Sequence, residues 1–204
     1  GYAIDVNSVT VPSGGGVVVY DFVATASDGS VTGFTASGSG ISLGTDLTEV
    51  AVANSSTVRQ TVTYVITPRT TGSVVGADCS GSSVTVVMSI DPTPAVTSAA
   101  SDNICSGNAV NYVPTANVSG TIFNWTASNT VGTVSGFTAA GSGTIVDVLT
   151  NTTNVIGTVR YVITPVANGC IGSAFNVDIT VDPQPVVTTI VSPVSQVVCD
   201  GAGY

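Results

Sequence analysis

The segment FNVDITVD, residues 175–182, alternates apolar and polar side chains from its first residue to its last. An alternation of period two puts one set of side chains on each face of a β-strand. The side chains predicted to face a core are Phe175, Val177, Ile179 and Val181. The segment VTVVMSID, residues 84–91, is its counterpart. Helical periodicity with capping residues is found nowhere in the sequence, so the chain is predicted to be all β.

The counterpart exists because the sequence repeats itself. Three pairs of matching segments lie 91 to 103 residues apart, which is the length of one small domain. The pairs are GFTASGSGI (33–41) with GFTAAGSGTI (136–145), TYVITP (63–68) with RYVITP (160–165), and SIDPTPAVTS (89–98) with TVDPQPVVTT (180–189). Because proline cannot donate to a ladder, Pro68 and Pro165 are expected to end their strands. The 204 residues are enough for two cores of about 100 residues each.

The matches also predict where the domains begin and end. We expect one domain at 1–92, a second at 93–183, and the opening strand of a further repeat at 184–204. The first domain lacks its opening strand, because its first residues, GYAIDVNSVTVP, match GNAVNYVPTANV (107–118). The tail PVVTTIVSPVSQVVCDGAGY (185–204) instead repeats PAVTSAASDNICSGNA, with which the second copy opens.

Aromatic residues fix the register of an earlier strand. Trp125 lies 12 residues before Phe137, and Phe22 lies 12 residues before Phe34. The resulting core anchors are Tyr20, Phe22, Phe123 and Trp125. Large aromatics that alternate on one face of a strand fill the space between the two sheets of an immunoglobulin-like sandwich. A ligand-binding aromatic platform is the alternative interpretation of Trp125.

The first copy is longer than the second at two places. It has 6 extra residues between Phe34 and Tyr64, and 6 more between Tyr64 and Cys79. We expect these residues in loops or lengthened hairpins near 42–60 and 69–78. Loops on a rigid scaffold often carry binding sites, but neutral variation of loop length is an equally good explanation.

Composition excludes several functions. The chain has three arginines, no lysine, no histidine and a net charge of -9, so nothing is available to neutralise the phosphates of a nucleic acid. Without histidine the usual general base, triad member and metal ligand are missing. We therefore predict that the chain is not an enzyme and uses no cofactor. No apolar run approaches the roughly 20 residues of a membrane-spanning helix.

Four cysteines occupy repeated positions and are candidates for disulfides: Cys79, Cys105, Cys170 and Cys199. An even, regularly placed set is typical of an oxidised, extracytoplasmic protein. Zinc is a poor alternative, because no CxxC pair exists. Pairing within the second copy joins Cys105 to Cys170. Pairing across the junctions joins Cys79 to Cys105 and Cys170 to Cys199. We prefer the within-copy bridge, although five expected intervening strands argue that its cysteines lie at opposite ends of a sandwich.

Asp91 and Asp182 precede the Pro-x-Pro segments at the domain junctions. They are weak candidates for a calcium site, because calcium takes six or more oxygen ligands and no acidic partner is near in the sequence. A turn-forming Asp-Pro that leads into a stiff linker is the simpler interpretation.

The ordered set CxG, F-x-W, GSG-x-I, Y-x-ITP, GC-x-G and V-D-P-x-P resembles the PKD-like, immunoglobulin-type repeats of giant Bacteroidota surface proteins, including gliding-motility adhesins. The resemblance covers the whole chain. It implies type IX secretion, display on the cell surface and a stalk or filament role, and it brings no catalytic residues. The first copy departs from the pattern, since Tyr20 and Phe22 replace F-x-W and its loops are longer.

Together these observations predict a spacer segment of an extracellular, filamentous cell-surface adhesin. Its expected partners are neighbouring repeats of the same chain and other copies of the filament, with a surface glycan or substratum as a further possibility. The alternative is a carbohydrate-binding module of a secreted protein. Such a module should expose two or more aromatic side chains on one face.

Overall fold

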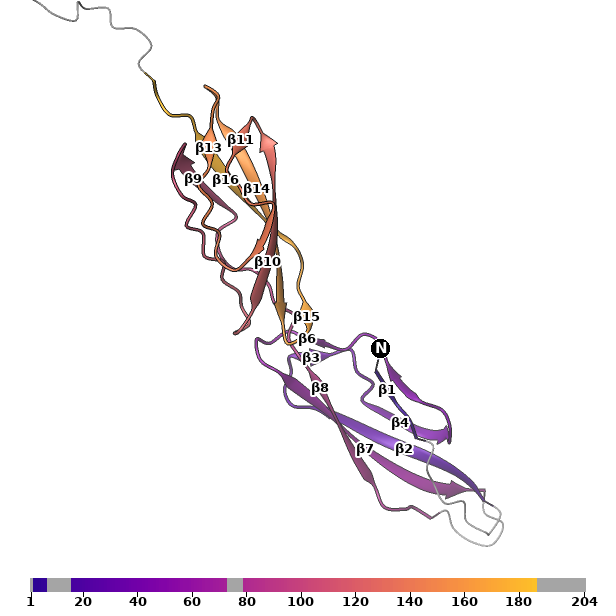
Figure 1. The fold of residues 1–204 in the computed structure, drawn as a ribbon. Helices are drawn as coiled ribbons and strands as arrows, with labels where there is room; N and C mark the ends of the chain where they lie inside the picture. The colour runs from indigo at the N-terminus through magenta and orange to yellow at the C-terminus, as the bar shows by residue number, and fades with distance from the viewer. Residues whose placement is uncertain (1, 7–15, 73–78, 187–204) are drawn as a thin grey trace, which may run out of the picture. The chain divides into compact units, whose positions relative to one another are not determined.

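The structure, a computed structural model, describes residues 2–6, 16–72 and 79–186. These residues form sixteen strands and no helix, so the predicted all-β fold class is confirmed. No helix that could span a membrane is therefore present in the described ranges. The sheets built from β1 to β8 contain only residues of the first repeat, and those built from β9 to β16 only residues of the second (Figure 1).

The first repeat is built on an antiparallel sheet with the strand order β4-β2-β7-β8. Its strands are β2 (Val17–Ala26), β4 (Ser37–Ser42), β7 (Gln60–Thr71) and β8 (Val84–Ile90). A second, smaller sheet pairs β1 (Tyr2–Ile4) with β5 (Leu47–Glu49). A third short pair joins β3 (Val31–Thr32) to β6 (Ala53–Asn54). From Tyr20 in β2 and from Val62 in β7, buried side chains alternate with more exposed ones, as a strand with one buried face requires.

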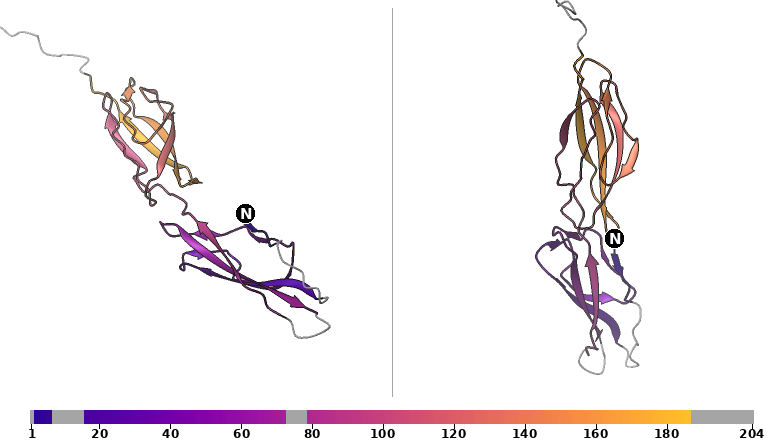
Figure 2. Two further views of the ribbon diagram at one scale, coloured as in Figure 1. Left: turned by 60° about the horizontal axis from the view of Figure 1, so that its bottom comes forward. Right: turned by 60° about the vertical axis from the view of Figure 1, so that its left-hand side comes forward.

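The second repeat has the corresponding sheet with six strands, five of which follow the order β12-β10-β14-β16-β9. Its strands are β9 (Ser101–Cys105), β10 (Ile122–Val131), β12 (Ala140–Ser142), β14 (Gly157–Ala167) and β16 (Phe175–Asp182). The short β15 (Cys170–Ile171) pairs with β14, and β11 (Val134–Ser135) pairs with β13 (Thr150–Asn151). Isolated antiparallel bridges join Ala109 to Val148 and Tyr112 to Ile145. Figure 2 shows these strands from two further sides.

The opening segment of the second repeat makes two successive pairings. Val96 first bridges Ala116 in an antiparallel contact. Residues Ser101–Cys105 then pair with β16 in parallel, with Ser101 opposite Asp178 and Cys105 opposite Asp182. In the first repeat β8 is the counterpart of β16, and it ends its sheet with no strand on its outer edge among the described residues.

Aromatic side chains fill both cores. Tyr20 and Phe22 of β2 are 0% and 3% exposed, and Trp125 of β10 is 7% exposed; Phe123 is half-buried. The Trp125 ring meets Tyr161 edge-on at a centroid distance of 5.5 Å. Phe22 lies 6.1 Å from Tyr64. The position of Phe22 and Trp125 thus anchors each sandwich, whereas Phe123 is less buried than Tyr20 at the other position.

The repeated GSG motif supports these rings. Gly38 pairs with Phe22 across β2 and β4, and a methyl group on Gly38 would lie 2.5 Å from Cε1 of that ring. Gly141 lies in the same way against the indole of Trp125. Because a side chain at either position would displace the core aromatic, glycine is required by packing there.

Two expectations about local structure are corrected. Pro68 and Pro165 do not end their strands, since β7 continues to Thr71 and β14 to Ala167. Each proline lies beside the end of the neighbouring strand, and its carbonyl accepts the N–H of Gly81 or Gly172 at 2.8 Å. The absence of a proline N–H at that position therefore weakens the pairing between the two strands only slightly.

The extra residues of the first repeat are also distributed differently from the prediction. Phe34 and Glu49 are five residues further apart than Phe137 and Asp147, and most of this length extends β4 and its turn, because β4 has 6 residues and β12 has 3. The turn that begins at Asn54 has a close counterpart in the second repeat. The second insertion lengthens the hairpin after β7, and its residues 73–78 lie outside the described residues.

Candidate functional site

All three arginines of the chain are bonded to aspartates. Arg59 donates from two nitrogens to both carboxylate oxygens of Asp91, each at 2.8 Å. Arg160 donates in the same way to Asp178, at 2.7 and 2.8 Å. These hydrogen bonds lower the pKa of both aspartates. Since the sequence has no other basic side chain, every cationic side chain of the chain is engaged by a carboxylate.

The third pair belongs to a network that crosses three strands of the first repeat. Asp21 of β2 accepts from the backbone N–H of Gly40 at 2.7 Å, from the hydroxyl of Ser39 at 2.8 Å, and from Nε of Arg69 at 2.8 Å. These bonds, with that from Gly40 the largest cause, lower the pKa of Asp21 to about 2. The equivalent residue of the second repeat is Asn124, so this network distinguishes the two repeats.

A carboxylate, a threonine and a tyrosine form the same unit in both repeats. In the first, Glu49 accepts from the N–H of Thr35 and from the hydroxyl of Tyr64, both at 2.9 Å. In the second, Asp147 accepts from the N–H of Thr138 at 3.0 Å and from the hydroxyl of Tyr161 at 2.6 Å. Burial is the main cause of the raised pKa of both tyrosines, and the hydrogen bond to the carboxylate adds to it. The unit ties the turn of the GFTA motif to the central strand.

A second repeated unit holds one end of each sandwich. The amide nitrogen of Asn151, which is 5% exposed, donates to the carbonyls of Val155 and Val181 at 2.7 and 2.9 Å. Asn54 makes the same two bonds, to Val58 and Ile90, at 2.8 and 2.9 Å. Each asparagine begins an Asn-x-Ser/Thr sequence. Both side-chain amides donate to backbone carbonyls. The Asn-x-Ser/Thr pattern therefore reflects a structural turn and not an exposed acceptor for a glycan.

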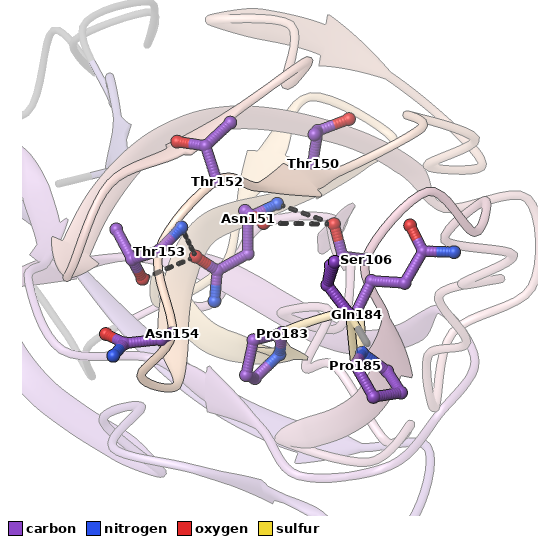
Figure 3. A pocket seen from close by; sticks show the side chains of 10 residues that line it. Ser106, Thr150, Asn151, Thr152, Thr153, Asn154, Pro183, Gln184 and Pro185 are labelled. Carbon is purple, nitrogen blue, oxygen red and sulfur yellow. Dashed lines mark hydrogen bonds between the residues drawn. The ribbon is translucent and has the colours of Figure 1, made fainter. Parts of the chain in front are cut away.

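A hollow of about 620 Å³ lies at this end of the second repeat (Figure 3). Asn151 lies in it with Ser106 and Thr153, and the Pro183-Gln184-Pro185 segment forms another side. Ser106 accepts the N–H of Asn151 at 2.9 Å. All of the lining side chains are uncharged, so the hollow offers hydrogen bonds but no acid, base or ion-pair partner.

The two candidate calcium ligands make other contacts, each within its own repeat. Both carboxylate oxygens of Asp91 accept from Arg59. Asp182 lies at the end of β16, where its carbonyl accepts the N–H of Ser106 at 2.9 Å. Among the described residues no three His, Cys, Asp or Glu side chains are close enough together to hold a metal ion.

The preferred disulfide within the second repeat is wrong. Cys105 ends β9 opposite Asp182, whereas Cys170 lies opposite Ala167 at the other end of the sheet (Figure 1). The strand β16 runs between these ends, and its length separates them by about 23 Å. A disulfide requires Cα atoms within about 7 Å, and both thiols are free in the structure.

The other cysteines leave the junction pairing as a prediction. Cys79 lies in the hairpin after β7, where its N–H donates to the hydroxyl of Thr70 at 3.0 Å. Cys199 lies outside the described residues.

Exposed apolar side chains on the described surface are almost all valine and isoleucine, and Tyr2, at 42% exposed, is the only aromatic among them. The aromatic residues that could have formed a sugar-binding platform are therefore inside the sandwiches or half-buried. This arrangement favours a packing role for Trp125.

Comparison with families of known sequence identifies the repeats. The model of the PKD-like domain matches the chain twice, at residues 7–94 and 102–185. The chain matches no curated protein and no solved structure. PKD-like domains are extracellular, non-catalytic repeat modules as a rule. The two matches cover most of the sequence and coincide with the two sets of sheets, and the chain therefore belongs to the PKD-like domain family, of which it contains two tandem copies.

Proposed function

We propose that the chain is a spacer segment of a filamentous adhesin displayed on the cell surface. The observation that carries the proposal is that both repeats devote their polar and aromatic groups to internal bonds. The three arginines, the core tyrosines and the repeated asparagines all bond within their own repeat. Such a module supplies length and stability.

We also propose the domain limits that the sequence indicates and an origin among Bacteroidota surface proteins. The first repeat ends at 92, the second at 183, and residues 184–204 open the repeat that follows. Type IX secretion and a contribution to gliding or surface attachment complete the proposal. They rest on the resemblance of the motif set to Bacteroidota surface repeats.

Two measurements on the source cell test the proposal: exposure of the repeats at the cell surface, and attachment of cells that lack them. Antibodies raised against the two repeats should label intact, unpermeabilised cells and should lose their target after brief external proteolysis. Deleting both repeats in frame should leave the protein at the surface and reduce attachment, because the spacer is shortened. Labelling only after permeabilisation would contradict the proposal.

A carbohydrate-binding module is the second candidate, favoured only by the polar hollow lined by Asn151, Thr153 and Gln184. Binding of the chain to an array of surface glycans, lost on Gln184→Ala, would support this candidate. Absence of binding at millimolar sugar would leave the spacer as the better explanation.

A further inference from the structure

The Pro-x-Pro segment that leads into the second repeat lies against that repeat. Gly172, which follows β15, is buried. A methyl group on Gly172 would overlap the carbonyl oxygen of Pro94 and would lie 2.8 Å from Cγ of Pro165. Pro94 is itself buried, although Thr93 and Ala95 on either side of it are exposed. The linker backbone therefore approaches Gly172 more closely than a residue with a side chain would allow.

The residues that follow Pro94 are held by hydrogen bonds to the same repeat. The N–H of Ala95 donates to Oδ1 of Asn117 at 2.7 Å, and the carbonyl of Ala95 accepts the N–H of Asn117 at 3.2 Å. Two residues later, the N–H of Thr97 donates to the carbonyl of Thr115 at 2.8 Å. The chain is thus held in place from Pro94 to Thr97.

The equivalent glycine of the first repeat, Gly81, has the same local structure. Its N–H donates to the carbonyl of Pro68 at 2.8 Å, as that of Gly172 does to Pro165. Gly81 is nevertheless exposed, and the atoms nearest to a methyl group on it all belong to Pro68, with Cγ at 3.0 Å. Among the described residues, only Gly172 of this pair has linker backbone against it, so Gly81 offers a matched control.

The Pro-x-Pro segment that leaves the second repeat is not covered in this way. Pro185 holds the position in Pro183-Gln184-Pro185 that Pro94 holds in the earlier linker. Gln184 and Pro185 are both exposed, whereas Pro94 is buried. The burial of Pro94 therefore comes from its contacts with Gly172 and Pro165, and not from the Pro-x-Pro sequence itself.

The linker is also held at its first residue. Both carboxylate oxygens of Asp91 accept from Arg59, each at 2.8 Å. Only Pro92 and Thr93 lie between Asp91 and the contacts that begin at Pro94. The ring of Pro92 fixes its own φ, and Thr93 precedes a proline, which favours an extended backbone. The linker therefore has few freely rotating bonds.

We propose that Gly172 and Asn117 form a clamp that holds residues 94–97 as a fixed part of the second repeat. Gly172 is a positioning residue for the linker, because only glycine leaves room for the carbonyl of Pro94. The clamp itself does not depend on where the protein is displayed, whereas its use as a stiff joint rests on the proposed spacer function.

Digestion of the folded 204-residue chain with a post-proline endoprotease that accepts whole proteins tests the clamp. Mass spectrometry identifies the bonds that are cut, and the exposed Pro185–Val186 bond is the internal reference. In the wild type, cleavage after Pro94 should be slower than after Pro185 by about tenfold or more, because the clamp must open first. Gly172→Ala should abolish most of this protection, since the new methyl group displaces the linker, and Gly81→Ala should preserve it.

Cleavage after Pro165, within β14, shows whether the second repeat itself has unfolded. Asn117→Ala removes the side-chain acceptor of Ala95 and leaves Gly172 in place, so it should also speed cleavage after Pro94 and not after Pro165. Equal wild-type rates after Pro94 and Pro185 would overturn the proposal, as would a Gly172→Ala chain that stays protected. If Gly172→Ala exposes Pro165 as well, Asn117→Ala decides: the proposal stands if that variant opens the bond after Pro94 alone, and it falls otherwise.

Discussion

Gly38 lies against the ring of Phe22, and Gly141 lies against the indole of Trp125. Replacing Gly38 by alanine should destabilise the first repeat by about 1–3 kcal/mol, because the new methyl group overpacks the ring of Phe22. Chemical denaturation followed by circular dichroism measures this change. Gly29→Ala is the matched control, since a methyl group there meets nothing within 4 Å. Equal midpoints for the two variants would show that the ring moves aside without cost.

Asp21 gives the first repeat a specific dependence on pH. Its pKa is lowered to about 2 in the folded chain, from about 3.9 when unfolded. A lowered pKa stabilises the fold fully above the unfolded value, and the stabilisation is lost as the pH falls through the folded value. The stability difference between the wild type and Asp21→Asn should therefore shrink between about pH 4 and pH 2. Urea denaturation at several pH values measures it, and a constant difference would contradict the network.

At this scale the sequence predicted the aromatic anchors but not their polar partners. Glu49 and Asp147 each accept a hydrogen bond from the core tyrosine of their repeat. Their equivalence is hard to see in the sequence, because the residue types differ and five extra residues precede Glu49. The asparagine units left a signal, because ANSSTV and TNTTNV share an asparagine, a hydroxyl residue two positions later and a valine. The signal alone did not predict the bonds, because the sequence does not show that a strand carbonyl lies within reach of each asparagine.

The side chain of Asn151 holds the turn from Asn151 to Val155 and joins it to the end of β16. Asn151→Ala should destabilise the second repeat by about 1–3 kcal/mol, because the carbonyls of Val155 and Val181 lose their donor. Asn154→Ala is the control in the same turn, since that residue is exposed. Thermal unfolding should separate the two variants. A stable Asn151→Ala chain would mean that water replaces the amide.

Strand positions followed directly from the period-two pattern, and their limits did not. Pro68 is a strong local signal for a strand end, but the neighbouring strand had already diverged there, and only the tertiary structure shows this. The insertion before Glu49 is another example, because added residues can lengthen a hairpin without changing the alternation that predicts it.

The two repeats should respond separately to damage in one core. Trp125→Ala is expected to cost the second repeat about 3–5 kcal/mol, because it leaves a large cavity beside Tyr161. Calorimetry should then show one lowered transition and one that is unchanged, since Trp125 lies wholly within the second core. A common shift of the entire unfolding curve would mean that the repeats unfold as one unit.

The parallel pairing of β9 with β16 has a consequence under mechanical tension. The chain enters the second repeat before β9 and leaves it after β16, so a pull along the chain slides these strands past each other and loads their five aligned residue pairs together. Bonds loaded together resist more force than bonds opened one after another, as in a pulled hairpin. In a single-molecule stretching experiment the second repeat should therefore break at the higher force. The first repeat should reach that force only when a strand occupies the outer edge of β8.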